Sequence, residues 1–317
     1  MSSYYTSDEL ISSIKRRAMI PSNQNTFSDT DFLAFADEEM NIGLVPSVVQ
    51  MHEDYFLYTQ DIPIDPSKKK YTIPYRAIGN KLREVSYLDA QGNVYEMTRI
   101  GVGDLPYYNS AYTYNRAYAF YISNNEICLV PNTLTLSSGT FLRVSYYIRP
   151  NSLVLLEKVA VISSINTSTG EIQLSNLPSD FSTNTLLDFL QVKSPHKTLS
   201  FDIAPVSINS TSKIITFNVN DIPENLSIGD HIALAEECAI PQVPSDLHVV
   251  LAHRVAARCL EALGDIEGLQ AANQKLAEME QKTQNLIDNR VEDAPQKIVN
   301  RHSILRRGTY RRYRFRG

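Results

Sequence analysis

The sequence has 317 residues, 43% hydrophobic and 21% charged, which is typical of a globular protein long enough for two or three packed modules. It contains no apolar run of about 18 residues and no apolar stretch behind its N-terminal charges, so we expect neither a membrane span nor a secretory signal. Its 30 Lys and Arg and 35 Asp and Glu give a formal net charge of −5, unevenly distributed along the chain.

Three helices are predicted at the start of the chain. The first begins at Thr6, whose hydroxyl has the capping-box spacing to Glu9, and it ends at Pro21. A second starts at Ser28 with apolar residues at helical spacing. The third covers about residues 47–58, with a proline in its first turn.

From Ile62 to Ile240 the sequence has short β-rich runs separated by turns, which predicts a large antiparallel β region. The strands and hairpins expected in its first part cover residues 70–73, 84–88 with 94–97, 119–122 with 127–130, and 141–148. Residues 104–118 are rich in tyrosine and lack a clear period, so we expect a loop there.

Two stretches of the second part resemble each other. Residues 164–178 and 207–223 both indicate a strand, a polar turn, a strand and an apolar–Pro step. A further strand is predicted after each, near 188–192 and 229–234. A duplicated three-strand unit forming a small barrel or sandwich explains the similarity. A coincidence of hairpin chemistry explains it equally well.

Helical spacing returns after the β region. A helix capped by Ser245 is expected to end at Gly264, and a long polar helix with a thin apolar stripe follows over residues 266–291. Two helices joined this tightly predict an antiparallel hairpin. Because both ends of the chain are helical, we expect an α+β fold in which residues 1–58 and 243–291 form one bundle with the β region inserted. The expected units are the N-terminal bundle helices (1–60), the two parts of the β insertion (61–150 and 151–242), the C-terminal helical hairpin (243–292) and an extended basic arm (293–317).

The sequence lacks the common catalytic and ligand-binding motifs. It has no phosphate-binding glycine loop, no HExxH and no GxSxG. Its three cysteines lie far apart, as expected for reduced thiols, and its six histidines are isolated in the sequence. We therefore expect no catalytic residues, no cofactor and no metal site. An enzyme is the least expected class, although carboxylates brought together only by folding stay possible in principle.

Residues 295–317, the core of the arm, have a distinct composition. They hold eight basic residues and no acid, so residues 1–294 carry a net charge of −13. Such a segment can stay solvated, contact nucleic acid through phosphates and stacked bases, or fold on a protein partner. Interleaved aromatic and apolar residues favour the protein partner. The candidate partner-binding residues are Lys297, Arg301, Ile304, Leu305, Arg306, Arg307, Tyr310, Arg311, Arg312, Tyr313, Arg314, Phe315 and Arg316.

Several short segments resemble head-to-tail adaptor proteins of tailed phages. The resemblance rests on Asp8–Arg17 with Ile20-Pro21, Asp31–Leu33 with Glu38–Met40, Tyr71–Gly79, and Ile240–Pro244 leading into Leu260–Asp265. The chain is most similar to the ring, or neck, proteins of podovirus-type phages, in particular those of crAss-like phages. None of these segments carries a chemical signature.

The resemblance implies a helical bundle with a β insertion, assembled as a homo-oligomeric ring of usually twelve copies at the head–tail junction of the virion. Its expected partners are the portal protein, on which the C-terminal arm docks, neighbouring copies, and the next ring or tail component. Packaged double-stranded DNA would pass through the lumen without specific binding. An acidic lining would repel DNA phosphates and let the DNA slide.

Two other functions compete with the connector. A tail-fibre or receptor-facing module would use a ligand-binding surface on residues 62–240 and would not need the arm. A nucleic-acid-binding protein would use residues 295–317 and would bind DNA with a steep dependence on salt.

Overall fold

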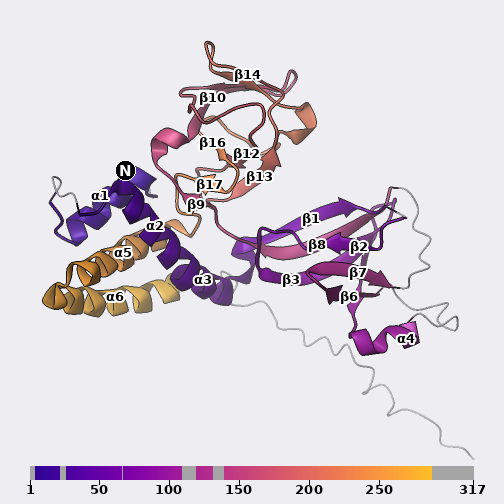
Figure 1. Ribbon diagram of the computed structural model, residues 1–317, viewed down its shortest axis with the longest axis horizontal. Helices are drawn as coiled ribbons and strands as arrows, with labels where there is room; N and C mark the ends of the chain where they lie inside the picture. The colour runs from indigo at the N-terminus through magenta and orange to yellow at the C-terminus, as the bar shows by residue number, and fades with distance from the viewer. Residues whose placement is uncertain (1–3, 22–25, 66, 109–118, 131–138, 288–317) are drawn as a thin grey trace, which may run out of the picture.

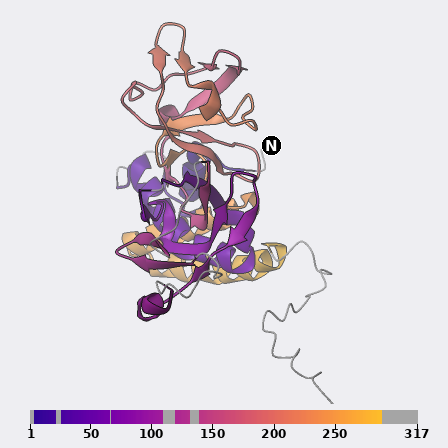
Figure 2. The same ribbon diagram turned by 90° about the vertical axis from the view of Figure 1, so that its right-hand side faces the viewer.

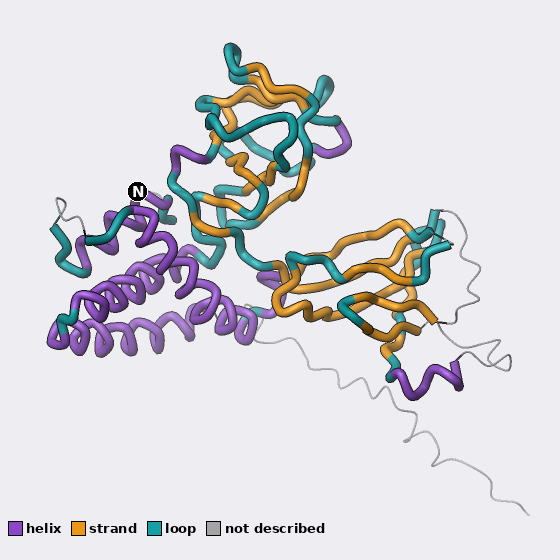
Figure 3. The backbone as a smooth tube through the Cα atoms, viewed as in Figure 1, coloured by secondary structure: helices purple, strands orange, loops and turns teal. Residues whose placement is uncertain are grey.

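The computed structural model describes residues 4–21, 26–65, 67–108, 119–130 and 139–287, which form three modules (Figure 1). The helical module (4–56 and 239–287) lies beside a second β module (151–238) and a first β module (57–150). Figure 3 shows the long helices gathered in one lobe and the strands in the other two, with the short helix at residues 105–108 beside the strands of one of them. The expected α+β class, with terminal helices and a central β region, is therefore confirmed.

The helical module begins with α1 (Ser7–Arg17) and α2 (Asp29–Glu39). The backbone N–H of Glu9 donates to the Thr6 hydroxyl at 3.4 Å, and its carboxylate accepts from the Thr6 N–H at 3.0 Å. This is the predicted capping box, and Ser28 forms a second one at the start of α2.

The third helix differs from the prediction. A π-helical stretch (Met40–Leu44) continues α2 directly into α3 (Val45–Met51), and a 3-10 turn (Glu53–Phe56) follows. The prediction of a helix up to residue 58 is therefore wrong. The backbone of His52 leaves the helical region, and strand β1 (Leu57–Pro63) instead pairs with residues 141–147 far along the chain.

The C-terminal helices form the predicted antiparallel hairpin. The prediction of a Ser245 cap is wrong, because Ser245 begins a 3-10 turn (Ser245–Leu247) and α5 (His248–Leu263) starts without a side-chain cap. Helix α5 ends at Gly264 in the left-handed region, and α6 (Ile266–Ile287) returns along α5. Residues 288–291 of the predicted helix lie outside the described residues. The N-terminal helices and the C-terminal hairpin share one apolar core, so the described residues form the predicted bundle with an inserted β region.

The first β module stacks two four-stranded sheets with the orders β1-β8-β3-β4 and β2-β7-β6-β5. Its other strands are β2 (Lys70–Thr72), β3 (Ala77–Leu88), β4 (Val94–Glu96), β5 (Thr98–Arg99), β6 (Ala119–Ser123), β7 (Glu126–Val130) and β8 (Phe141–Ile148). The side chains between the sheets, among them Val85, Ile127 and Tyr146, form a core of their own. Each predicted strand of this part is present.

One segment of this module is more ordered than expected. Residues 104–118 were predicted as a loop, but a 3-10 turn (Val102–Asp104) continues into the short helix α4 (Leu105–Tyr108). The Asp104 carboxylate accepts the Gly101 N–H at 3.2 Å and so caps this turn. The loop prediction is therefore wrong for residues 104–108, and residues 109–118 lie outside the described part.

The second β module is built on one seven-stranded sheet with the order β13-β12-β16-β10-β11-β15-β14. Its strands are β10 (Ala160–Asn166), β11 (Glu171–Leu174), β12 (Leu187–Leu190), β13 (Thr198–Ile203), β14 (Ser207–Asn209), β15 (Ile214–Thr216) and β16 (His231–Leu234). Corresponding strands of the two similar stretches pair with each other, β11 with β15 and β12 with β16. The two similar stretches therefore lie side by side in one sheet.

The chain enters and leaves the second β module through two short adjacent strands. Strand β9 (Ser152–Leu153) at its start pairs in parallel with β17 (Glu237–Cys238) at its end. The Leu153 N–H donates to the Asp37 carboxylate of α2 at 2.9 Å, and this hydrogen bond links β9 to the helical module. In the view of Figure 2 the second β module stands above the other two. None of the described helices is long and apolar enough to cross a membrane.

Candidate interaction groove and the joint between modules

The partner-binding residues predicted from the sequence, Lys297 through Arg316, all lie outside the described residues. The described part of the chain offers two other features built from charged side chains. One is an open groove on the helical module, and the other is a buried polar network where the three modules meet.

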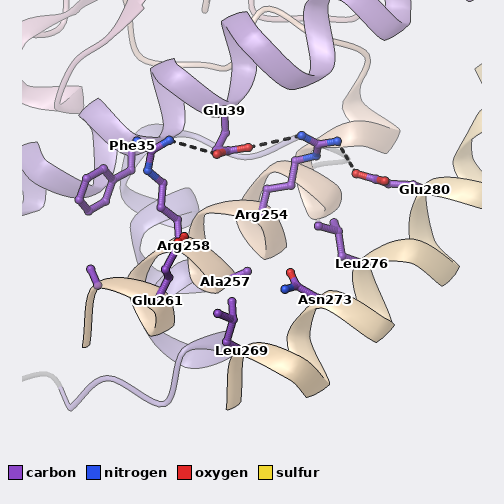
Figure 4. Close-up of a pocket in the computed structure, with 11 residues that line it drawn as sticks. Phe35, Glu39, Arg254, Ala257, Arg258, Glu261, Leu269, Asn273, Leu276 and Glu280 are labelled. Atoms are coloured by element: carbon purple, nitrogen blue, oxygen red, sulfur yellow. Dashed lines mark hydrogen bonds and ion pairs between the residues drawn. The ribbon is translucent and has the colours of Figure 1, made fainter. Parts of the chain in front are cut away.

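The groove lies among α2, α5 and α6 and has a volume of about 650 Å³ (Figure 4). Helix α5 forms its floor, while α2 and α6 form its walls. Its lining residues are Phe35 and Glu39 from α2, Arg254, Ala257, Arg258, Glu261 and Ala262 from α5, and Leu269, Asn273, Leu276 and Glu280 from α6. The lining thus combines apolar side chains with carboxylates and guanidinium groups.

Arg254 connects the walls of the groove. Its guanidinium forms ion pairs with Glu39 at 3.4 Å and with Glu280, and so joins α2 to α6 across α5. A Cβ at Gly43 would lie 2.0 Å from Nη1 of Arg254, so the absence of a side chain there makes room for the guanidinium. Each partner is about a fifth to a third exposed, so each pair contributes no more than about 1 kcal/mol.

Arg258 makes a similar contact one turn further along α5. It pairs with Glu39 at 3.2 Å and with Glu38, and its guanidinium carbon lies 5.4 Å from the ring centre of Phe35. The arginines therefore hold the α2 carboxylates in fixed positions at the groove. The lining carries three carboxylates against two guanidinium groups, and Glu261 is the carboxylate with no ion pair among the described residues, so the groove suits a segment that is apolar and carries positive charge near Glu261.

The buried network is centred on Arg76, which immediately precedes β3 in the first β module. Its guanidinium donates to both carboxylate oxygens of Asp188 on β12, at 2.8 and 3.1 Å, and to Asp202 on β13 at 2.7 Å. The side chains of Arg76 and Asp188 are 3% and 0% exposed, so this ion pair is removed from water. Burial opposes the charged guanidinium, but hydrogen bonds and the charge of Asp188 raise the pKa of Arg76 above its ordinary value.

Asp188 also accepts hydrogen bonds from residues of the segments that connect the modules. It accepts the Asn151 side-chain amide at 2.8 Å and the backbone N–H groups of Asp202 and Glu236 at 3.0 and 3.1 Å. The Gln242 side chain accepts the Asn151 N–H at 2.7 Å and donates to Thr198. Since Gln242 leads into the C-terminal helices, the network joins all three modules. We call Arg76, Asp188, Asp202, Asn151 and Gln242 the central joint.

Three histidines that are isolated in the sequence come together beside this joint. The rings of His196 and His248 lie 5.2 Å apart, and His231 lines the same small cavity as His196. Nδ1 of His248 accepts the Tyr5 N–H at 2.9 Å, so Nε2 carries the proton and donates to the Pro241 carbonyl. Burial lowers the pKa of both His248 and His231 to about 4 and also lowers that of His196.

The described residues contain no group of three His, Cys, Asp or Glu side chains placed to hold a metal ion. The three cysteines are buried free thiols. Burial raises the pKa of the Cys259 thiol to about 11 and raises that of Cys238 as well, so both are protonated at neutral pH.

The central joint was not predicted from the sequence, because its residues are far apart in the chain. Tyr75-Arg76 and Gln242 lie within two of the segments that carry the resemblance to phage adaptors. Part of the groove lining was visible in the sequence, because Leu269 and Leu276 belong to the predicted thin apolar stripe of the last helix. The sequence matches no model of a known protein family and no curated protein.

Proposed function

We propose that this chain is a structural protein of a tailed-phage virion, which forms a homo-oligomeric ring connecting the portal to the tail. The observation that carries the proposal is the architecture. A helical bundle made from both ends of the chain bears a large β insertion, as the resemblance to phage adaptors implies. The ring would surround a lumen through which packaged DNA passes without specific binding.

The central joint favours a mechanical role. A connector transmits load between neighbouring components, which requires its modules to keep fixed relative positions. A buried, multiply hydrogen-bonded arginine–carboxylate network holds a specific geometry, because moving either module would leave a charge unpaired away from water. Such a network fixes geometry even where it adds little to net stability.

The parts of the chain have separate places in this proposal. The helical module would build the ring, and the inserted β region would face the next ring or tail component. Residues 295–317 would bind the portal, since their eight basic residues and interleaved aromatics suit acidic clefts on a protein. Virion localisation is part of the same proposal.

A binding experiment with purified portal protein tests the proposal. The full chain and a chain ending at Ala294 are each mixed with portal assemblies and sedimented together. We expect the full chain to sediment with the portal and the shortened chain to lose most of this binding. A matched control replaces the six arginines between positions 306 and 316 with glutamine, which keeps the length and removes the charge.

Equal binding by the full and shortened chains would contradict the role of the segment. No binding of the full chain under any salt condition would contradict the connector function itself. Salt-dependent binding to DNA in place of portal would favour the nucleic-acid alternative.

A further inference from the structure

The groove on the helical module is an open surface between two helices. Helices α2 and α6 both pack against α5, and the groove between them is not filled by any other described segment (Figure 4). The α6 residues that line it, Leu269, Asn273, Leu276 and Glu280, recur every three to four residues and therefore share one face. Leu269 and Leu276 remain only partly buried, so apolar surface on this face is still available to a further segment.

The helices around the groove are acidic. Helix α2 contains five acidic residues and no basic residue, α5 one acidic and two basic, and α6 three acidic and two basic, which gives a net charge of −5 for the three helices. Glu261 is exposed at the groove and has no ion-pair partner among the described residues. A segment that fills the groove should therefore be basic as well as apolar.

We propose that the groove binds the chain's own residues 295–317. This segment carries eight basic residues and no acid, and Ile298, Val299, Ile304 and Leu305 supply apolar side chains for the open face. The complementarity of charge and of apolar character selects it over the remainder of the chain, because residues 1–294 carry a net charge of −13.

The chain length allows the segment to reach the groove of the same copy. The described part of helix α6 extends seven residues beyond Glu280, about 10 Å, to Ile287. The seven residues 288–294 can span up to about 23 Å, which is enough to reverse direction and return. A tether this short gives an effective concentration in the millimolar range, which favours binding within one copy. The inference does not rest on the proposed ring, because it requires no second copy.

The two binding sites proposed for residues 295–317 have a consequence for assembly. If the segment occupies the groove of the free chain, a portal must compete with the groove to bind it. The groove would then cover this basic and apolar segment and prevent nonspecific binding until a partner of higher affinity displaces the groove.

Binding of a labelled peptide of residues 295–317 tests the inference by fluorescence anisotropy. The acceptor is a chain ending at Ala294, which retains every described residue and the whole core of the helical module. We expect saturable binding to this chain. The full-length chain should bind the peptide at least about tenfold more weakly, because its own segment competes.

Two matched pairs of variants of the shortened chain locate the peptide. Asn273→Trp fills the groove from an exposed position on α6, whereas Gln274→Trp places the same ring on an exposed position outside the lining. We expect Asn273→Trp to bind the peptide about tenfold more weakly and Gln274→Trp to bind it as tightly as the unsubstituted shortened chain. Glu261→Lys should weaken binding about threefold, and Glu267→Lys, outside the lining, should leave it unchanged.

Each of the following results would overturn the inference. The first is a lack of saturable binding of the peptide by the shortened chain, the second is equal binding by the two tryptophan variants, and the third is binding by the full-length chain that is as tight as binding by the shortened one. A scrambled peptide of the same composition that binds as well as the natural one would reduce the interaction to net charge and would also overturn it. Circular dichroism on each variant confirms that the helices remain folded.

Discussion

Arg76 illustrates how much of the arrangement of modules depends on single buried charges. Replacing it with methionine would leave the carboxylate of Asp188, 0% exposed, without its main counter-charge. We expect Arg76→Met to lower the free energy of unfolding by about 3–5 kcal/mol. Urea denaturation followed by circular dichroism measures this change.

Two further variants separate the buried charge from the loss of packing. Arg143→Met breaks an ion pair with Asp61 whose partners are both about a third exposed, and it should cost no more than about 1 kcal/mol. The double variant Arg76→Met with Asp188→Leu should recover part of the loss, because no unpaired charge remains. Equal losses for Arg76→Met and Arg143→Met would contradict this account of the joint.

His248 should make the protein sensitive to acid. Its pKa is about 4 in the folded state against an ordinary value of 6.5, so the unfolded chain takes up the proton first as the pH falls. The stability contribution is therefore full above pH 6.5 and is lost between pH 6.5 and 4, by about 3 kcal/mol. His248→Gln, which can still accept from Tyr5 and donate to Pro241, should lose less stability over this range. Parallel pH profiles for the variant and the natural chain would contradict the assignment.

Asp37 should have the opposite pH dependence. Burial raises the pKa of its carboxyl from 3.8 to about 7, despite the hydrogen bond from the Leu153 N–H. Its stabilising contribution is therefore present below pH 3.8 and is lost as the pH rises through 7. Asp37→Asn keeps an acceptor for Leu153, so we expect it to stabilise the protein by about 2–4 kcal/mol at pH 8 and to have little effect at pH 4. Denaturation at the two pH values measures the difference, and a gain of the same size at both would argue against ionisation as the cause.

At the scale of elements, Gly170 determines how the two similar hairpins of the second β module meet. Its φ is +74°, and a Cβ there would lie 2.2 Å from the backbone oxygen of Phe217. Gly229 has a φ of +91°, but a Cβ there would meet no atom within 4 Å. Gly229→Ala should therefore cost only backbone strain, about 1–2 kcal/mol, and Gly170→Ala clearly more. Thermal unfolding of both variants measures this difference, and an equal loss would show that the contact with Phe217 is not restrictive.

The elements that the sequence predicted well are those with local causes. The capping box at Thr6, the helix start at Ser28 and the helix end at Gly264 depend on residues within a few positions, and the structure confirms them. The third helix was predicted too long because its end is decided by pairing with β8, more than 80 residues away. The central joint was not predictable for the same reason, since Arg76 and Asp188 are 112 residues apart.

At the scale of the whole molecule, the helix–β–helix order predicted the bundle with its insertion, because terminal helices can share a core only if the chain returns to its start. The groove was predictable only in part. The apolar stripe of α6 is visible in the sequence, but the ion pairs of Arg254 across three helices appear only in the fold. The ring, its copy number and its partners are properties of an assembly and stay predictions.

The mass of the assembled particle tests the central claim most directly. The full chain is purified with and without portal protein, and native mass spectrometry is combined with electron microscopy of the same samples. We expect closed rings of a single copy number, with an open lumen, at least when the portal is present. A chain that stays a monomer of 35.8 kDa under both conditions and forms no complex with the portal would contradict the connector function.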